Sequence, residues 1–273
     1  MTSDICSFCK KGKLTTLFQY NAPPEGETRF NFSNSYRREA LRCSHCGHIH
    51  LVHNMDLAGL YEHSYVDATY GDRGLKATFD RIASLPREKS DNTWRVDRVN
   101  SYASRWFERP ISANPRLTVL DVGSGIAIFP YAMRLAGWQT MALDPDERAV
   151  RHARETAGVE CVHTDFFQVR EIGRFDLVSF NKVLEHVKEP GAMLRLAHEV
   201  VRPGGLIYVE LPDGEAAAAA GAGRQEFFVE HFHAFSEDSM KLLASQAEFK
   251  VEAMERIREP SDKFTWYMFL SEP

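Results

Sequence analysis

The chain of 273 residues lacks the features of a membrane or secreted protein. It has no run of eighteen apolar residues, so no segment is expected to span a bilayer. Its first residues, MTSDICSFCKKGK, contain no apolar stretch typical of a secretory signal. We therefore expect a cytoplasmic protein without a membrane partner.

Excess positive charge is also missing. The sequence has 33 Lys and Arg against 38 Asp and Glu, for a formal net charge of -5. Because contacts to nucleic-acid phosphates need clustered basic residues, this balance argues against a nucleic-acid partner. Residues 1–50 differ mildly, with seven Lys and Arg against four Asp and Glu. The composition favours a small-molecule substrate.

Cysteine is rare, and its arrangement predicts a metal site. Four of the five cysteines form two C-x-x-C pairs, Cys6 with Cys9 and Cys43 with Cys46. In an intracellular chain this pattern is more typical of metal binding than of disulfides or a redox pair. Four thiolates suit a structural, tetrahedral Zn²⁺ site, with neighbouring histidines outside the ligand set. The fifth, Cys161, falls in an apolar stretch and is expected in the core.

Changes in apolar periodicity divide the chain into three parts. Residues 1–55 hold the cysteine pairs and predict a zinc-ribbon-like module. Residues 56–110 predict a connector followed by a helical segment on the substrate side, because Val96 and Val99 begin an apolar face at helical spacing. Residues 111–273 predict a catalytic domain.

The third part alternates short apolar runs with helical stretches. This alternation predicts a Rossmann-like α/β fold, a mostly parallel seven-stranded sheet with helices on both faces. The expected strands are 118–122, 140–144, 159–163, 175–180 and 206–211, followed by a hairpin of 250–258 and 264–270. The expected helices are 129–135, 147–157 and 190–201.

A glycine-containing loop gives the most specific functional signal. The run DVGSGIA begins at Asp121, at the end of a predicted strand, and its Gly123 and Gly125 allow the backbone to approach a ligand. Dinucleotide-binding folds use similar loops, but their third glycine is replaced here by Ile128. Asp121 could attract a cationic amino-acid group. Asp144, which ends the next strand, could accept hydrogen bonds from both ribose hydroxyls.

Over residues 118–211 the sequence resembles class I S-adenosylmethionine (SAM)-dependent methyltransferases. The strand-end motifs DVGSG, LDP, TDF, FDLVSFNKVLEHV and VVRPGGLIYVELP follow one another in the order and spacing of that family. The resemblance implies SAM as cofactor, with Glu185 and His186 in a helix start packed beneath it. Asp165 could alternatively serve only as a helix cap. The residues implied at the cofactor are Gly123 and Gly125 at the methionine, Asp144 at the ribose, Asp165 and Phe166 at the adenine, and Asn181 beneath the cofactor.

The acceptor side resembles known families less closely. The cysteine pairs and residues 228–236 resemble bacterial methyltransferases that act on sugars, nucleotide-linked sugars or natural-product intermediates. His231 and Glu230 match a His and a Glu of the sugar C-methyltransferases, whereas Phe228 replaces their Tyr. We therefore predict His231 as general base, with Glu230 and His233 as further candidates, and favour O-methylation over C- or N-methylation. The alternative is that His231 only precedes a helix near Ser236.

Two other functions fit parts of this sequence. Some RNA base methyltransferases carry an N-terminal zinc module, although the loop after Asn181 lacks the Pro-Pro-aromatic motif used on exocyclic base nitrogens. A non-catalytic SAM-binding scaffold would keep the glycine loop and Asp144. A homodimer is left open by the sequence.

Overall fold

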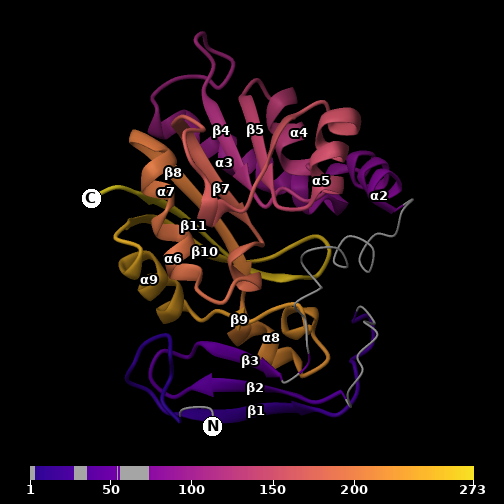
Figure 1. Cartoon of the computed structure of the whole chain (residues 1–273), viewed down its shortest axis with the longest axis vertical. Coiled ribbons are helices and arrows are strands. Elements are labelled where there is room, and N and C mark those ends of the chain that lie inside the picture. Colours follow the sequence, from indigo (N-terminus) through magenta and orange to yellow (C-terminus); the bar gives the residue numbers. More distant parts are fainter. Residues whose placement is uncertain (1–3, 28–35, 54, 56–73) are drawn as a thin grey trace.

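The computed structural model describes residues 4–27, 36–53, 55 and 74–273. The predicted connector, residues 56–73, lies outside these ranges. Figure 1 shows a small β-sheet at one end of the molecule and a larger α/β body at the other, with α8 and β9 between them. No described helix is both long enough and apolar enough to cross a membrane.

The larger body contains the seven-stranded sheet expected from the sequence. Its strand order is β10-β11-β8-β7-β4-β5-β6. The five strands from β8 to β6 pair in parallel, and β11 and β10 add antiparallel to β8. The strands are β4 (Thr118–Val122), β5 (Gln139–Asp144), β6 (Glu160–His163), β7 (Phe175–Asn181), β8 (Val201–Pro212), β10 (Lys250–Arg258) and β11 (Phe264–Ser271).

Helices cover both faces of this sheet because successive strand residues point to opposite sides and both are apolar. Val119 and Leu120 are both fully buried, but they pack into different cores. The core around Val119 includes Val99 and Met133, and that around Leu120 includes Leu194. The helices are α2 (Gly74–Ala83), α3 (Asp91–Trp106), α4 (Ile128–Leu135), α5 (Glu147–His152), α6 (Pro190–Arg195), α7 (Ala197–Val200), α8 (Gly214–Ala220) and α9 (Glu237–Gln246).

Two predicted helices are interrupted in the structure. The stretch 147–157 starts as α5 but continues as a π-helical turn, η3 (Ala153–Ala157). The stretch 190–201 divides into α6 and α7 at Leu196, and Val201 already belongs to β8. Helix α3 follows the prediction, with Val96 and Val99 buried.

The small sheet has four strands, and one of them comes from the far end of the chain. Strands β1 (Leu14–Tyr20), β2 (Arg38–Cys43) and β3 (Ile49–His53) form an antiparallel meander. The two-residue strand β9 (His233–Ala234) then pairs with β3, opposite His50 and Ile49. The predicted N-terminal module is thus completed by residues of the catalytic part.

A buried ion pair adds a second connection between the two parts. Arg38 Nη2 lies 2.7 Å from Glu27 Oε1, and both side chains are almost completely buried. Arg38 also donates a hydrogen bond to the carbonyl oxygen of Phe227. Val229 N donates to Glu27 Oε1 at 2.8 Å. The small sheet therefore holds residues 227–229 in place.

Candidate active site

A cavity of about 770 Å³ opens where β4, β5 and β7 end, and residues 225–231 contribute to its lining. Ligand pockets typically measure about 300–1,000 Å³. In open α/β sheets ligands bind outside the carboxyl ends of the parallel strands, which is where this cavity lies. The position is therefore that of a cofactor site.

The glycine loop forms one wall of the cavity. Gly123 and Gly125 have φ of +66° and +50°, in the left-handed region. A Cβ on Gly123 would lie 2.9 Å from Val183 Cγ2, so no larger residue fits there without displacing Val183. Gly125 N donates to Asp144 Oδ2 at 2.8 Å, which ties the loop to the end of β5.

Asp144 reaches the cavity with both carboxylate oxygens already held. Its Oδ1 accepts a hydrogen bond from Asp146 N at 2.9 Å, opposite the bond from Gly125. The side chain lines the cavity and is 7% exposed. This burial raises the pKa of Asp144 to about 6. The oxygens keep lone pairs for a ligand, because a carboxylate offers about four acceptor sites.

Asp165 and Phe166 also line the cavity, as the resemblance implied. Asp165 accepts a hydrogen bond from Phe167 N at 2.9 Å and so caps the short helix η4 (Phe166–Gln168). It is therefore both a helix cap and a cavity residue. Phe166 is 3% exposed, whereas Phe167 is 39% exposed and offers an aromatic face that the sequence analysis did not single out.

Asp121 lies behind the cavity wall. It is not among the cavity-lining residues and is 2% exposed. Its Oδ1 instead accepts hydrogen bonds from Ser179 Oγ and Asn181 Nδ2, each at 2.7 Å. Burial raises the pKa of Asp121 to about 7. The carboxylate sits behind Asn181, which lines the cavity, so Asp121 orients a cavity residue rather than facing the ligand itself.

The other end of the cavity gathers a carboxylate and two imidazoles. Glu185, His186, Glu230 and His231 all line it. One carboxylate oxygen of Glu185 and one ring nitrogen each of His186 and His231, the atoms that could bind a metal, lie within 4.8 Å of one another. Glu185 and His186 belong to the short helix η5 (Leu184–His186), so they form the expected helical turn but also face the site. Their contribution to the cavity was missed.

Burial sets the protonation state of this cluster. Glu185 is 1% exposed, and within the described part of the chain its Oε2 has no hydrogen-bond partner. Burial raises the pKa of Glu185 to about 8. Burial, reinforced by repulsion from His231, lowers the pKa of His186 to about 3, and burial lowers that of His231 to about 4. Both imidazoles are therefore neutral near pH 7.

His233 corrects the prediction that placed it with His231. Its Nδ1 lies 3.0 Å from His48 Nε2, and together with His50 these side chains form a separate buried group. His233 does not line the cavity. The reason is a change of backbone direction: His231 follows a turn, whereas His233 pairs in β9.

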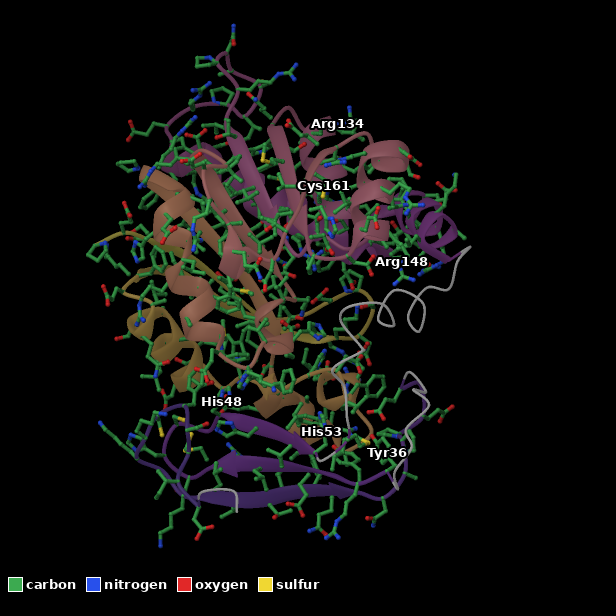
Figure 2. All side chains as sticks on the ribbon, in the orientation of Figure 1. Tyr36, His48, His53, Arg134, Arg148 and Cys161 are labelled. Carbon is green, nitrogen blue, oxygen red and sulfur yellow. The ribbon has the colours of Figure 1, made fainter. Side chains whose placement is uncertain are left out.

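The four predicted metal ligands are brought together at the edge of the small sheet. The Sγ atoms of Cys6 and Cys46 are 4.0 Å apart, and those of Cys9 and Cys43 are 3.6 Å apart. A tetrahedral zinc with bonds of about 2.3 Å would place its sulfurs about 3.8 Å apart. Cys161 lies in the α/β body, far from His48 in the module (Figure 2), and is buried as expected.

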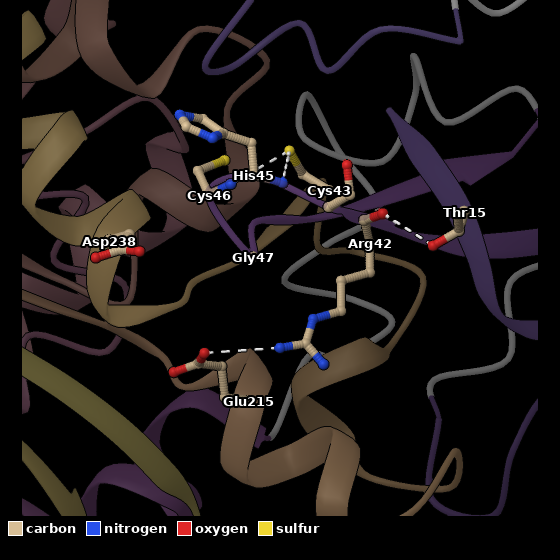
Figure 3. A pocket seen from close by; sticks show the side chains of 9 residues that line it. Thr15, Arg42, Cys43, His45, Cys46, Gly47, Glu215 and Asp238 are labelled. Carbon is tan, nitrogen blue, oxygen red and sulfur yellow. Dashed lines mark hydrogen bonds and ion pairs between the residues drawn. The ribbon is translucent and has the colours of Figure 1, made fainter. Parts of the chain in front are cut away.

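A smaller hollow of about 330 Å³ lies beside the second cysteine pair. Figure 3 shows Arg42 reaching across it toward Glu215, with 3.7 Å between Nη2 and Oε1. Gly47 and Asp238 also border it. It shares no lining residue with the larger cavity and is therefore a separate feature, in which a half-exposed ion pair connects the module to α8.

The helical segment predicted on the substrate side packs elsewhere. None of the described residues 74–110 lines the larger cavity. Asn92 Nδ2, near the start of α3, donates to Ile128 O at 3.3 Å, so α3 lies against α4. Two cations also line the cavity: Lys182, which follows Asn181 in the chain, and Lys263, which the sequence analysis did not single out.

Fold and cavity together define the class I fold of the SAM-dependent methyltransferases. A family described as a methyltransferase domain matches residues 75–254, and the chain belongs to that family. The ubiquinone biosynthesis O-methyltransferase of Leptothrix cholodnii is 27% identical over 141 residues, covering 49% of this chain and 60% of that protein. The same enzyme of Pseudomonas paraeruginosa is 34% identical over 145 residues, covering 50% and 62%. The chain thus spans about three fifths of the length of these curated relatives.

Solved structures show the same fold. Magnesium protoporphyrin IX methyltransferase of Synechocystis, with bound S-adenosylhomocysteine (SAH), superposes with a TM-score of 0.58 at 15% identity over 80% of this chain and 100% of that chain. The 1,6-didemethyltoxoflavin-N1-methyltransferase of Burkholderia thailandensis, with bound 1,6-didemethyltoxoflavin and SAH, gives a TM-score of 0.53 at 16% identity over 92% of this chain and 99% of that chain. The two comparisons agree with the fold described above for the larger body.

Proposed function

We propose that this methyltransferase transfers the methyl group of SAM to a hydroxyl oxygen of a small molecule, most specifically a sugar, a nucleotide-linked sugar or a related natural-product intermediate. The observation that carries the proposal is the continuous cavity, with cofactor-type residues at one end and the Glu185, His186 and His231 cluster at the other. The similarity to ubiquinone biosynthesis O-methyltransferases supports oxygen as the acceptor atom.

In this proposal SAM occupies the end formed by β4 and β5. Gly123 and Gly125 leave room for the methionine part, and Asp144 accepts hydrogen bonds from the ribose hydroxyls. The remaining contacts are Asp165 and Phe166 at the adenine and Asn181 at the methionine end. Asp121 acts through Asn181, because its carboxylate holds that amide.

Methyl transfer is an in-line displacement at the sulfonium methyl, so holding acceptor and cofactor in line supplies much of the rate. The acceptor oxygen must lose its proton as the C–O bond forms and the S–C bond breaks. His231 is our candidate base. Its Nδ1 is 3.0 Å from Glu226 O, which fixes the ring with Nε2 on the opposite edge. Glu230 lies beside it in the cavity wall.

The test replaces His231 with Ala. We expect turnover to fall at least about a hundred-fold, within the range of general-base contributions. SAH affinity, measured by calorimetry, should stay within about twofold because His231 lies at the acceptor end. His198→Ala is the matched control, since His198 also contacts a backbone carbonyl, Ala247 O at 3.0 Å, but lies outside the cavity.

Labelled SAM with a panel of nucleotide sugars, and separately with total RNA, identifies the acceptor class. Labelled sugar products support the proposal. Labelled RNA would indicate an RNA methyltransferase, and SAH binding without any labelled product would indicate a scaffold.

We further propose that residues 1–55 form a zinc-binding module in which Cys6, Cys9, Cys43 and Cys46 hold one structural Zn²⁺. The sulfur separations fit tetrahedral tetrathiolate geometry. Backbone N–H groups also point at the sulfurs: Gly12 N lies 3.4 Å from Cys9 Sγ, and Cys46 N lies 3.4 Å from Cys43 Sγ. Such donors stabilise thiolate charge.

A further inference from the structure

We propose that Glu185, His186 and His231 bind a divalent first-row transition-metal ion at the acceptor end of the cavity. Two imidazoles and one carboxylate are a donor set that such ions accept with open positions for other ligands. The catalytic role given to the ion rests on the proposed function, whereas the binding site does not.

The orientation of the two imidazoles is the first observation. His186 Nδ1 lies 3.0 Å from Glu230 O, and His231 Nδ1 lies 3.0 Å from Glu226 O. A carbonyl can only accept, so each Nδ1 carries the hydrogen and Nε2 is the acceptor nitrogen of each ring. Metal-binding histidines are typically held in this way, with the second ring nitrogen donating to a carbonyl or carboxylate.

The carboxylate is the second, independent observation. Among the described residues Glu185 Oε2 has no hydrogen-bond partner, although Glu185 is 1% exposed. An unpaired buried carboxylate is costly unless a cation or a proton neutralises it. The two lysines of the cavity pair elsewhere. Lys182 Nζ lies 3.0 Å from Glu259 Oε1, and Lys263 Nζ lies 3.8 Å from Asp91 Oδ2.

The spacing of the three donors fits an ion after a small closure. Their ligand atoms lie within 4.8 Å of one another. Three donors bound at about 2.1 Å from one ion lie about 3.0–3.6 Å from one another. The most widely separated side chains therefore need to approach by roughly an ångström or somewhat more.

Such an ion would give the acceptor hydroxyl a place to lose its proton. Oxygen bound to a divalent cation is more acidic, as metal-bound water shows. The O–H bond breaks, the proton leaves to bulk water, and the oxygen electron pair forms the bond to the methyl carbon. The S–C bond electrons remain on sulfur and SAH leaves. His231 would then act as a metal ligand rather than as the base.

The test uses the purified full chain, with its own metal content measured, and Mn²⁺ as the probe. Electron paramagnetic resonance reports free Mn²⁺, whose signal falls when the ion binds. We expect one bound Mn²⁺ per chain, weakened at least about tenfold by Glu185→Gln and by His231→Asn. His198→Ala should bind Mn²⁺ like the unmodified chain, because its ring lies near Glu272 but outside the cavity.

Unchanged SAH affinity in each variant shows that the fold is intact. A dissociation constant for Mn²⁺ above about 1 mM, or equal binding by all variants, would overturn the site. Failure of this proposal is distinguishable from failure of the proposed function. Methyl transfer without Mn²⁺ binding would leave O-methylation standing with His231 as the base.

Discussion

Asp144 offers the sharpest test of where the cofactor lies. Its carboxylate accepts hydrogen bonds from Gly125 N at 2.8 Å and from Asp146 N at 2.9 Å, and the side chain lines the cavity. Asp144→Ala removes the acceptors for the ribose hydroxyls and one anchor of the glycine loop. Charged hydrogen bonds contribute about 1.5–3 kcal/mol. We expect SAH affinity to fall about ten- to a hundred-fold.

Calorimetry with SAH measures this loss, and pH supplies a second readout. Because burial raises the pKa of Asp144 to about 6, with Asp146 and His163 as the nearby charges, the carboxylate protonates as the pH falls from 7 to 5. Protonation removes an acceptor for the ribose hydroxyls, so SAH binding should weaken as the pH falls through that window in the unmodified chain but not in the Ala variant.

Asp176→Asn is the matched control for Asp144. Asp176 also accepts a backbone hydrogen bond, from Thr118 N at 2.7 Å, but it lies at the opposite end of β7 and outside the cavity. SAH affinity should be unchanged there. Wild-type affinity in Asp144→Ala would refute the placement of the ribose at the end of β5.

Two further predictions concern the N-terminal module. Cys9→Ser should lower the bound zinc below one equivalent and unfold the module, because thiolate–zinc binding is coupled to folding. Cys161→Ser, the control, should keep the metal. Elemental analysis that finds less than about half an equivalent of zinc in the wild-type protein would contradict the site. Arg38→Met leaves Glu27 buried without its partner and should lower the free energy of unfolding by about 3–5 kcal/mol in urea titrations, with faster hydrogen exchange at Val229 N. Arg42→Met, which removes a half-exposed pair, should cost less than about 1 kcal/mol, and equal losses in both variants would refute the argument from burial.

Local patterns were sufficient to predict most of the α/β body. Strand β4 has the predicted bounds, and the hairpin of β10 and β11 extends beyond them by only one residue. These elements were predictable because apolar alternation and glycine positions are encoded within a few neighbouring residues. The helix breaks at Leu196 and after His152 were not predicted, because no Pro or Gly marks either position.

Contacts between distant segments could not be read in the same way. His231 and His233 are two residues apart in the sequence, yet one lines the cavity and the other meets His48. The ion pair of Glu27 and Arg38 and its bond to Val229 likewise join segments whose proximity no local pattern encodes. The surroundings of Asp121 are a related case, because Ser179 and Asn181 on the neighbouring strand β7 donate hydrogen bonds to its carboxylate.

The strand shared between module and body has a consequence for synthesis on the ribosome. Strand β3 ends at His53, but its partner β9 begins only at His233. At about 5–20 residues per second, the edge of β3 waits on the order of ten seconds for that partner. An open edge invites pairing with other chains. Early metal binding by the cysteine pairs of the nascent chain would stabilise β1 to β3 during this interval. A chain released before His233 is made would keep the unpaired edge of β3 permanently.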